Sequence, residues 1–314
     1  MGEFELIRRY FFPLAASGKH PDVLLGPGDD CAIQRVGKGQ ELVFSMDTLV
    51  EGVHFPKHYP PEKLGWRSLA VATSDLAAMG ADPVCFTLAI TLPRADPDWL
   101  RDFSSGLATA SRQFGLNLAG GDTTRGPLSL TLQVHGTVPE NRAIRRSGAK
   151  PGDLICVSGT LGNAGAALQF LDSDLPTPEQ AQLLEHYHAP QPRLLLGKAL
   201  RESASAAVDI SDGLVADLGH LLEESGVGGR IDVSQLPLSA ALVALRADAI
   251  DLALHAGDDY ELCTTLPEMA LEQLPESIRE QLTVIGRVHE GEGLLVNGKD
   301  PRGNSRGYDH FEGR

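Results

Sequence analysis

Cysteine, positive charge and long apolar runs are the scarce features of this chain. Its four cysteines lie far apart and include no C-x-x-C pair, so their spacing indicates neither a zinc site nor a disulfide framework. No stretch approaches the roughly 18 apolar residues of a membrane span, and the first residues carry acids rather than a basic leader. We therefore expect a cytoplasmic protein with no membrane partner.

Basic residues are outnumbered by acids, 27 Lys and Arg against 42 Asp and Glu, which gives a net charge of −15. Because nucleic-acid backbones are bound by clustered Lys and Arg, this balance argues against a nucleic-acid partner. Walker A, protein-kinase and dinucleotide-binding signatures are missing as well. The composition that remains, 42% hydrophobic and 22% charged, is that of a globular enzyme, and an acidic enzyme can still bind phosphates through metal ions.

The length of 314 residues exceeds what one core usually organises, so two domains are expected. Glycine, proline and charge interrupt the apolar pattern in RSGAKPGD, residues 146–153, and we place the boundary near residue 148. This gives an N-terminal domain at 1–148 and a C-terminal domain at 149–314. Strand and helix patterns alternate in both halves and predict an α/β (α+β) fold.

Hydrophobic periodicity locates the elements. In the first half it predicts strands at 41–55, 85–93 and 128–138, and helices at 61–79 and from Asp96 or Asp98 onward. In the second half it predicts a strand at 154–159 with a glycine-rich turn, a polar loop at 172–180, a helix at 193–203, a strand ending near Asp209 and a helix after Asp212.

Two of these strands have faces of different character. Within 41–55, one face carries Leu42, Phe44 and Met46, and the other carries Val43, Ser45, Asp47 and Leu49. Residues 128–138 alternate between apolar side chains and polar or small ones. Such a strand could line a shared barrel or a subunit contact, whereas an ordinary half-exposed strand is the simpler interpretation of the pattern alone.

Aspartates fall in glycine-flanked turns and in runs of small residues. PGDD places Asp29 and Asp30 in one turn, where two adjacent carboxylates either hold a cation or face solvent. Asp75 lies among small apolar residues of the predicted helix at 61–79. A carboxylate there needs a metal, an ion pair or exposure to water, because burying it alone is unfavourable.

Two further motifs combine aspartate with backbone donors. GGDTTRG, residues 120–126, joins Asp122 to glycines that let backbone N–H groups approach phosphate, and it fits nucleotide binding or a sharp turn. VDISDG carries Asp209 and Asp212 around Ser211 where a strand meets a helix, a place that gathers carboxylates and N–H donors toward phosphate. Helix capping by Ser211 or Asp212 alone is the simpler alternative.

Magnesium binds oxygen ligands and generally takes one or two protein carboxylates while it keeps water and phosphate oxygens. Several dispersed aspartates therefore predict several ions. Phosphoryl transfer needs charge neutralisation and alignment more than covalent chemistry. We accordingly predict a magnesium-dependent phosphoryl transfer with no catalytic residue acting as a covalent nucleophile.

Seven motifs resemble, in order and over nearly the entire chain, those of thiamine-monophosphate kinases: GPGDDCA, SMDTLVEGVHF, SDLAAMGADP, GGDTTRGPLSLTLQVHG, RSGAKPGD, DISDGL and GDDYEL. That family is related to aminoimidazole ribonucleotide synthetase and selenophosphate synthetase. The resemblance implies a two-domain ATP-binding fold with N-terminal sheets pairing across a homodimer. It also implies ATP-dependent phosphorylation of thiamine monophosphate to thiamine diphosphate, with several Mg²⁺ ions and, as a further candidate, K⁺ or another monovalent cation.

The resemblance assigns site residues position by position. The implied magnesium ligands are Asp30, Ser45, Met46 through its backbone, Asp47, Asp75, Asp122, Asp209 and Asp212. The implied ATP contacts are Gly121, Asp122, Arg146 and Ser211. The positions that contact thiamine phosphate are His54, Asp258 and Tyr308.

Two positions depart from the family pattern. Asp258 stands where the family commonly has Glu, so its carboxylate is one methylene shorter, and Ser305 stands where a tryptophan often precedes GYDHF. These departures keep open a non-catalytic nucleotide-binding or divalent-ion-binding protein on the same fold, beside another ATP-dependent enzyme of the superfamily. In the favoured mechanism a phosphate oxygen of thiamine monophosphate attacks the γ-phosphorus of ATP in line, without a general base. Mg²⁺ and Arg146 then relieve the repulsion between the two anions.

Overall fold

The computed structural model describes residues 2–16, 20–299 and 301, which form two compact units. Unit 1 comprises the chain up to Leu76 together with Ala81–Asn141, and unit 2 comprises Ala77–Gly80 and the chain from Arg142 onward. The predicted boundary near residue 148 stays a prediction. Within the described ranges, no helix is both long and apolar enough to cross a membrane.

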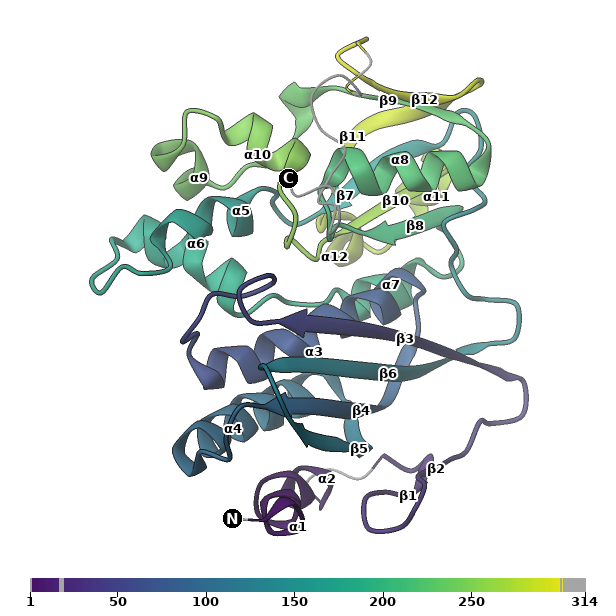
Figure 1. Cartoon of the computed structure of the whole chain (residues 1–314). Helices are drawn as coiled ribbons and strands as arrows, with labels where there is room; N and C mark the ends of the chain where they lie inside the picture. Colours follow the sequence, from purple (N-terminus) through teal and green to yellow (C-terminus); the bar gives the residue numbers. More distant parts are fainter. Residues whose placement is uncertain (1, 17–19, 300, 302–314) are drawn as a thin grey trace. The chain divides into compact units, whose positions relative to one another are not determined.

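Unit 1 is built on a four-stranded sheet, and two long helices, α3 and α4, lie behind it in Figure 1. The strands, in spatial order, are β3 (Gln40–Val50), β6 (Ser129–Pro139), β4 (Asp82–Leu92) and β5 (Asn117–Arg125). Only the β4–β5 pair is parallel. The helices are α3 (Pro61–Ala78) and α4 (Pro97–Phe114), and the N-terminal segments are α1 (Glu3–Leu6), η1 (Ile7–Phe11), α2 (Phe12–Ala16), β1 (Val23–Leu25) and β2 (Ile33–Gln34).

Helix α4 begins and ends where its sequence signals place it. The side chain of Asp96 accepts hydrogen bonds from the backbone N–H groups of Asp98 (3.1 Å) and Trp99 (3.3 Å), which satisfies donors that a helix start leaves unpaired. Gly115 ends the helix in the left-handed conformation, with φ of 70°. The predicted helix from Asp96 is therefore confirmed.

The face of the sheet that α3 and α4 leave open is formed in part by apolar side chains of β3. Phe44 is 60% exposed and Met46 is 58% exposed, while Ser45 and Asp47 on the other face are half-buried. On the neighbouring strand β6, every second residue from Leu130 to Val138 is buried. The two-faced character predicted for both strands is confirmed.

Strand β3 ends at Val50, five residues before the predicted end. A tight turn follows, in which the N–H groups of Val53 and His54 both donate to the carbonyl of Val50, at 3.1 and 3.0 Å. Gly52, with φ of 78°, gives the turn a backbone conformation that favours glycine. The predicted strand over 51–55 is wrong because this turn takes the backbone donors that a strand would offer to a neighbour.

Unit 2 contains a six-stranded mixed sheet covered by helices on both faces. Its strands, in spatial order, are β12 (Gly293–Val296), β9 (Gly228–Ile231), β11 (Leu282–His289), β7 (Leu154–Ser158), β10 (Leu262–Leu266) and β8 (Ala206–Asp209). Its helices are α5 (Asn163–Ala167), η2 (Leu168–Phe170), α6 (Pro178–His188), α7 (Leu194–Leu200), α8 (Leu214–Ser225), η3 (Val233–Gln235), α9 (Ala240–Leu245), α10 (Ala249–His255), α11 (Glu268–Gln273) and α12 (Glu276–Arg279).

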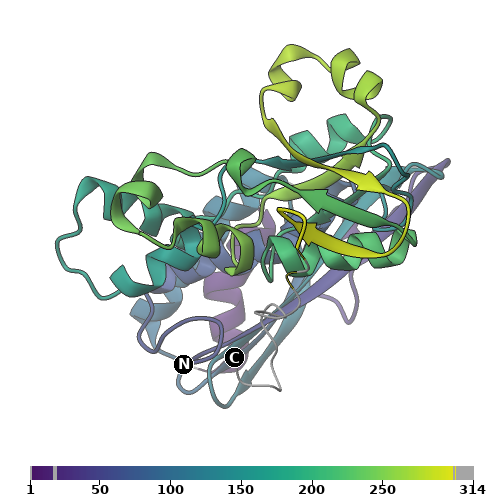
Figure 2. The same cartoon turned by 90° about the horizontal axis from the view of Figure 1, so that it is seen from above.

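Strand β7 shows why this sheet is covered twice. Ile155 and Val157 belong to one hydrophobic cluster with α8, and Leu154 and Cys156 belong to a second cluster with α7 and α11. Figure 2 shows α8 and the α11–α12 segment on opposite sides of the sheet. All five residues of β7 are buried, as expected for a strand with helices on both faces. The predicted α/β architecture is confirmed.

Helix α6 is an element that periodicity missed. Thr177 accepts from the N–H of Gln180, and the Gln180 side chain accepts from the N–H of Thr177, which forms a capping box. The helix therefore starts at Pro178, inside the predicted polar loop at 172–180, and the last three residues of that prediction are wrong. The signal was present in the sequence TPEQ.

Candidate functional site

In unit 1, the structure joins two of the predicted metal ligands. The hydroxyl of Ser45 on β3 donates a hydrogen bond to the carboxylate of Asp75 on α3. Asp75 is half-buried, which is intermediate between the buried and the exposed alternatives that its sequence context left open, and the predicted metal-ligand role stays a prediction. Asp47 is half-buried two residues farther along β3, on the same strand face as Ser45. These three side chains offer only oxygen atoms.

Three other predicted residues of unit 1 are exposed. Asp30 is exposed in a turn, where its N–H donates to Asp29 at 2.9 Å. Gly121 and Asp122 are exposed on β5, the opposite edge of the sheet from β3. Three strand spacings of about 4.8 Å separate these edges, so Asp122 is at least roughly 14 Å from Ser45 along the sheet.

Contacts with backbone atoms constrain two predicted residues of unit 1, His54 and Gly121. His54 lies in the turn after β3, where its Nδ1 accepts from the N–H of Val50 at 3.0 Å, so this nitrogen carries no proton in that arrangement. Gly121 has φ of 156°, and a Cβ there would collide with the carbonyl of Leu88. Only glycine fits this position without strain.

In unit 2, the DISDG and GDDYEL segments lie side by side. The N–H of Asp258 donates to the carbonyl of Ser211 at 2.9 Å, and the N–H of Tyr260 donates to that of Ile210 at 2.8 Å. The N–H of Ile210 returns a bond to the carbonyl of Glu261 at 2.8 Å. These bonds fix the predicted metal-binding segment and the predicted acceptor-binding segment against each other.

Asp217 holds the DISDG turn, although no sequence motif marks it. One of its carboxylate oxygens accepts from the N–H groups of Ser211 (3.0 Å), Asp212 (3.0 Å) and Gly213 (3.1 Å). Burial raises the pKa of Asp217 to about 7. Capping of α8 by Ser211 or Asp212 is therefore wrong, because Gly213 is the capping residue and the donors go to Asp217.

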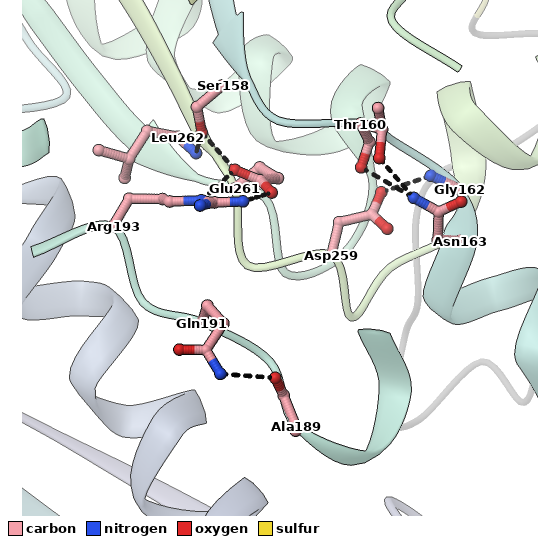
Figure 3. Close-up of polar contacts among 10 residues, drawn as sticks. All are labelled: Ser158, Thr160, Gly162, Asn163, Ala189, Gln191, Arg193, Asp259, Glu261 and Leu262. Atoms are coloured by element: carbon pink, nitrogen blue, oxygen red, sulfur yellow. Dashed lines mark hydrogen bonds and ion pairs between the residues drawn. The ribbon is translucent and has the colours of Figure 1, made fainter. Parts of the chain in front are cut away.

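Two carboxylates of the GDDYEL segment itself bind groups on neighbouring elements and so anchor the segment (Figure 3). Asp259 accepts from the N–H of Gly162 at 2.7 Å, at the start of α5. Glu261 is 2% exposed and accepts from Nε of Arg193 (2.6 Å), from its Nη2, and from the hydroxyl of Ser158 (2.5 Å). A buried glutamate needs such partners. The glycine-rich turn at 159–162 thus receives a protein carboxylate.

The two remaining predicted residues differ in what the structure says of them. Arg146 is exposed, and its carbonyl accepts from the hydroxyl of Ser225 at 3.0 Å. The same hydroxyl accepts from the N–H groups of Gly148 (3.1 Å) and Ala149 (3.2 Å), so Ser225 fixes the backbone around Arg146. Tyr308 lies outside the described residues.

The chemistry of these groups fits magnesium. In the part of the chain that the structure describes, no three His, Cys, Asp or Glu side chains form a cluster that could hold a metal ion. Magnesium does not require such a cluster, because it usually keeps water and phosphate oxygens beside one or two carboxylates. Ser45, Asp47 and Asp75 in unit 1 and Asp209 and Asp212 in unit 2 carry oxygen atoms of the kind that would bind it.

Sequence comparison places the chain among known proteins. The family model "AIR synthase related protein, N-terminal domain" matches residues 28–138, and "AIR synthase related protein, C-terminal domain" matches residues 150–298. The thiamine-monophosphate kinases of Salmonella typhimurium and Escherichia coli K12 are each 46% identical to the chain, over 99% of it and 98% of their own length.

Comparison with solved structures agrees. The thiamine-monophosphate kinase of Stenotrophomonas maltophilia is 44% identical, with a TM-score of 0.86 over 96% of this chain and 98% of that one. The structure named "AaThiL complexed with AMPPCP and TMP" is 31% identical, with a TM-score of 0.82 over 99% of this chain and 97% of that one. The chain therefore belongs to the AIR synthase related proteins and, within them, to the thiamine-monophosphate kinase family.

Proposed function

We propose that this chain transfers the γ-phosphoryl group of ATP to thiamine monophosphate and so produces thiamine diphosphate. The observation that carries this proposal is similarity over the full length: 46% identity to thiamine-monophosphate kinases over 99% of the chain. A relative with a TM-score of 0.82 is named as a complex with AMPPCP and TMP, and AMPPCP is an analogue of ATP. The reaction belongs to thiamine diphosphate biosynthesis.

The residues that hold the reactants form three sets in this proposal. Magnesium ions are bound by Asp30, Ser45, the backbone of Met46, Asp47, Asp75, Asp122, Asp209 and Asp212. ATP is contacted by Gly121, Asp122, Arg146 and Ser211. The acceptor is contacted by His54, Asp258 and Tyr308. K⁺ or another monovalent cation stays a prediction from the family resemblance, as does the cytoplasmic location.

The chain's own groups act by orientation and charge. Bound magnesium would neutralise the phosphate oxygens between which the phosphoryl group passes. The Ser45 hydroxyl orients the Asp75 carboxylate, Asp217 fixes the turn that carries Asp212, and Arg146 supplies positive charge beside the nucleotide. The acceptor phosphate is already an anion near neutral pH, so the transfer needs no protein nucleophile and no general base.

We also propose a homodimer that pairs the open sheet faces of unit 1. Leu42, Phe44 and Met46 on β3 are 42%, 60% and 58% exposed, and Phe44 and Met46 are paired in register with His135 and Gln133 of β6. A contiguous exposed apolar patch on a folded unit marks an interaction surface. A second copy of the chain is the occupant that the family resemblance favours.

The test of the reaction uses purified protein with Mg-ATP and either thiamine or thiamine monophosphate, with products identified by mass spectrometry. Thiamine diphosphate formed only from the monophosphate supports the proposal. Asp75→Asn and Asp212→Asn should each lower turnover roughly 100-fold, the scale of losing one transition-state charge contact. Asp251→Asn, at a side chain that is 74% exposed, is the matched control. ATP binding without any product would favour the non-catalytic alternative.

A further inference from the structure

The loop that carries Asp258 has an unusual backbone. Asp258 and Tyr260 both have positive φ, 70° and 50°, and residues other than glycine rarely adopt this backbone conformation. Two such residues within three positions persist only where the surroundings hold them. Tyr260 is 6% exposed, and its hydroxyl donates to Oδ1 of Asp258 at 2.9 Å.

The residues directly before and after Tyr260 in the chain are both held by partners outside the loop. Asp259 is bound by the N–H of Gly162 at 2.7 Å, and Glu261 is bound by Arg193 and Ser158 (Figure 3). The N–H groups of Asp258 and Tyr260 are bonded to the 210–211 backbone. The loop therefore cannot relax by itself, and the remaining freedom at Asp258 is that of its short side chain.

We propose that Tyr260 is a positioning residue that orients the Asp258 carboxylate toward the acceptor substrate. The inference rests on the proposed function, in which Asp258 contacts thiamine monophosphate. That substrate carries a cationic thiazolium ring and an amino group, and an ionised carboxylate complements both. A carboxylate that accepts a hydrogen bond from this hydroxyl enters the complex already oriented, so less rotational freedom is lost on binding.

Tyr260 should affect the binding of the acceptor substrate and not the binding of ATP. Asp258 faces the acceptor in this proposal, whereas ATP is held by other residues. A hydrogen bond to a charged group contributes enough that its loss weakens binding roughly tenfold. Tyr260→Phe should therefore raise KM for thiamine monophosphate about tenfold and change KM for ATP less than about twofold.

Steady-state kinetics of the full chain test this, with Tyr260→Phe, Asp258→Asn and the double variant. Tyr187→Phe is the matched control, because Tyr187 is a buried tyrosine of unit 2 that lies on α6, outside the loop. Phenylalanine keeps the ring packing, and melting temperatures identify any loss of folding. In the Asp258→Asn background, Tyr260→Phe should have no further effect on KM for thiamine monophosphate.

Three results would overturn the proposal. One is an unchanged KM for thiamine monophosphate in Tyr260→Phe, or in Asp258→Asn. Another is an equal rise in KM for both substrates, which indicates a general structural effect. The third is a full tyrosine effect that persists without the aspartate. If the unsubstituted protein makes no thiamine diphosphate, the proposed function fails instead, so the two failures are distinguishable.

Discussion

Asp217→Ala is the substitution whose effect on stability the structure defines best. One oxygen of this carboxylate accepts from three consecutive N–H groups, of Ser211, Asp212 and Gly213, and the side chain is 4% exposed. Alanine leaves all three donors without that acceptor. At about 1 kcal/mol of net stabilisation for each bond, the free energy of unfolding should fall by about 3 kcal/mol.

The raised pKa of Asp217 bounds this figure from above. Burial moves the pKa to about 7, which means that burying the ionised carboxylate is itself unfavourable. Removing the charge therefore recovers part of the free energy of unfolding that is lost with the three hydrogen bonds. Asp217→Asn keeps an acceptor oxygen without the charge, and it should lose less than about half of the alanine effect. Both variants should weaken Mg-ATP binding, because the anchored turn carries Asp212 and Ser211.

Urea unfolding followed by circular dichroism measures the effect, together with hydrogen exchange of the 211–213 amides. Circular dichroism is required because both tryptophans, Trp66 and Trp99, lie in unit 1 and their fluorescence does not report on the turn. Asp232→Ala is the control, since Asp232 accepts from the N–H of Ser234 at 2.9 Å in an exposed position. An alanine variant at 217 as stable as the control variant, with unchanged exchange at 211–213, would refute the reasoning.

Three further outcomes are expected. Arg193→Met should lower the unfolding free energy by about 3 kcal/mol, because it leaves the buried carboxylate of Glu261 without its cation; an urea midpoint equal to that of the unsubstituted protein would contradict this. Phe44→Asp should convert the proposed dimer to monomer in light scattering, while Leu175→Asp, at a side chain that is 92% exposed, should not; a dimer in both variants would exclude the β3 face. Burial lowers the pKa of His135 below its ordinary value of 6.5, so the unfolded chain binds the proton first as pH falls. The stability of the unsubstituted protein relative to His135→Gln should therefore decrease as pH falls below about 7, and unfolding titrations of the two proteins measure this difference.

Periodicity predicted β3, β4 and β6 in the sheet of unit 1, but not β5, where two glycines interrupt the apolar pattern; the sharp turn considered for residues 120–126 is wrong, because residues up to Arg125 belong to this strand. Strand β6 alternates between buried and half-buried residues along its whole length, and a pattern of period 2 is readable without knowledge of the neighbours. Helix α6 was missed because it is short and its start is set by local capping at Thr177 and Gln180. The end of β3 at Val50 was missed because the β-forming residues continue past it, whereas the N–H groups of Val53 and His54 bond within the turn and not to a neighbouring strand.

The site was predictable only in part. Its acids could be selected from their turns and small-residue context, and Ser45 could be placed beside Asp47 on one strand face. The bond between Ser45 and Asp75 could not be predicted, because it joins strand β3 to helix α3 across 30 positions in the chain. Asp217 was missed for a similar reason. An acid in the first turn of a helix is common, and the sequence does not show that one oxygen of this carboxylate accepts from three backbone N–H groups.

The GDDYEL segment shows how neighbouring acids each receive a partner. Three carboxylates occur within four residues, and burial together with the nearby charges of Glu261 and Asp258 raises the pKa of Asp259 well above its ordinary value. Each has a separate partner: the Tyr260 hydroxyl for Asp258, the Gly162 N–H for Asp259, and the Arg193 guanidinium for Glu261. Asp259 and Glu261 therefore serve as anchors of the loop, and Asp258 is the acid of the three that we propose contacts the acceptor. Acid count alone overstates the number of metal ligands in such a protein, because a carboxylate that binds backbone N–H groups stabilises the site without touching its ions.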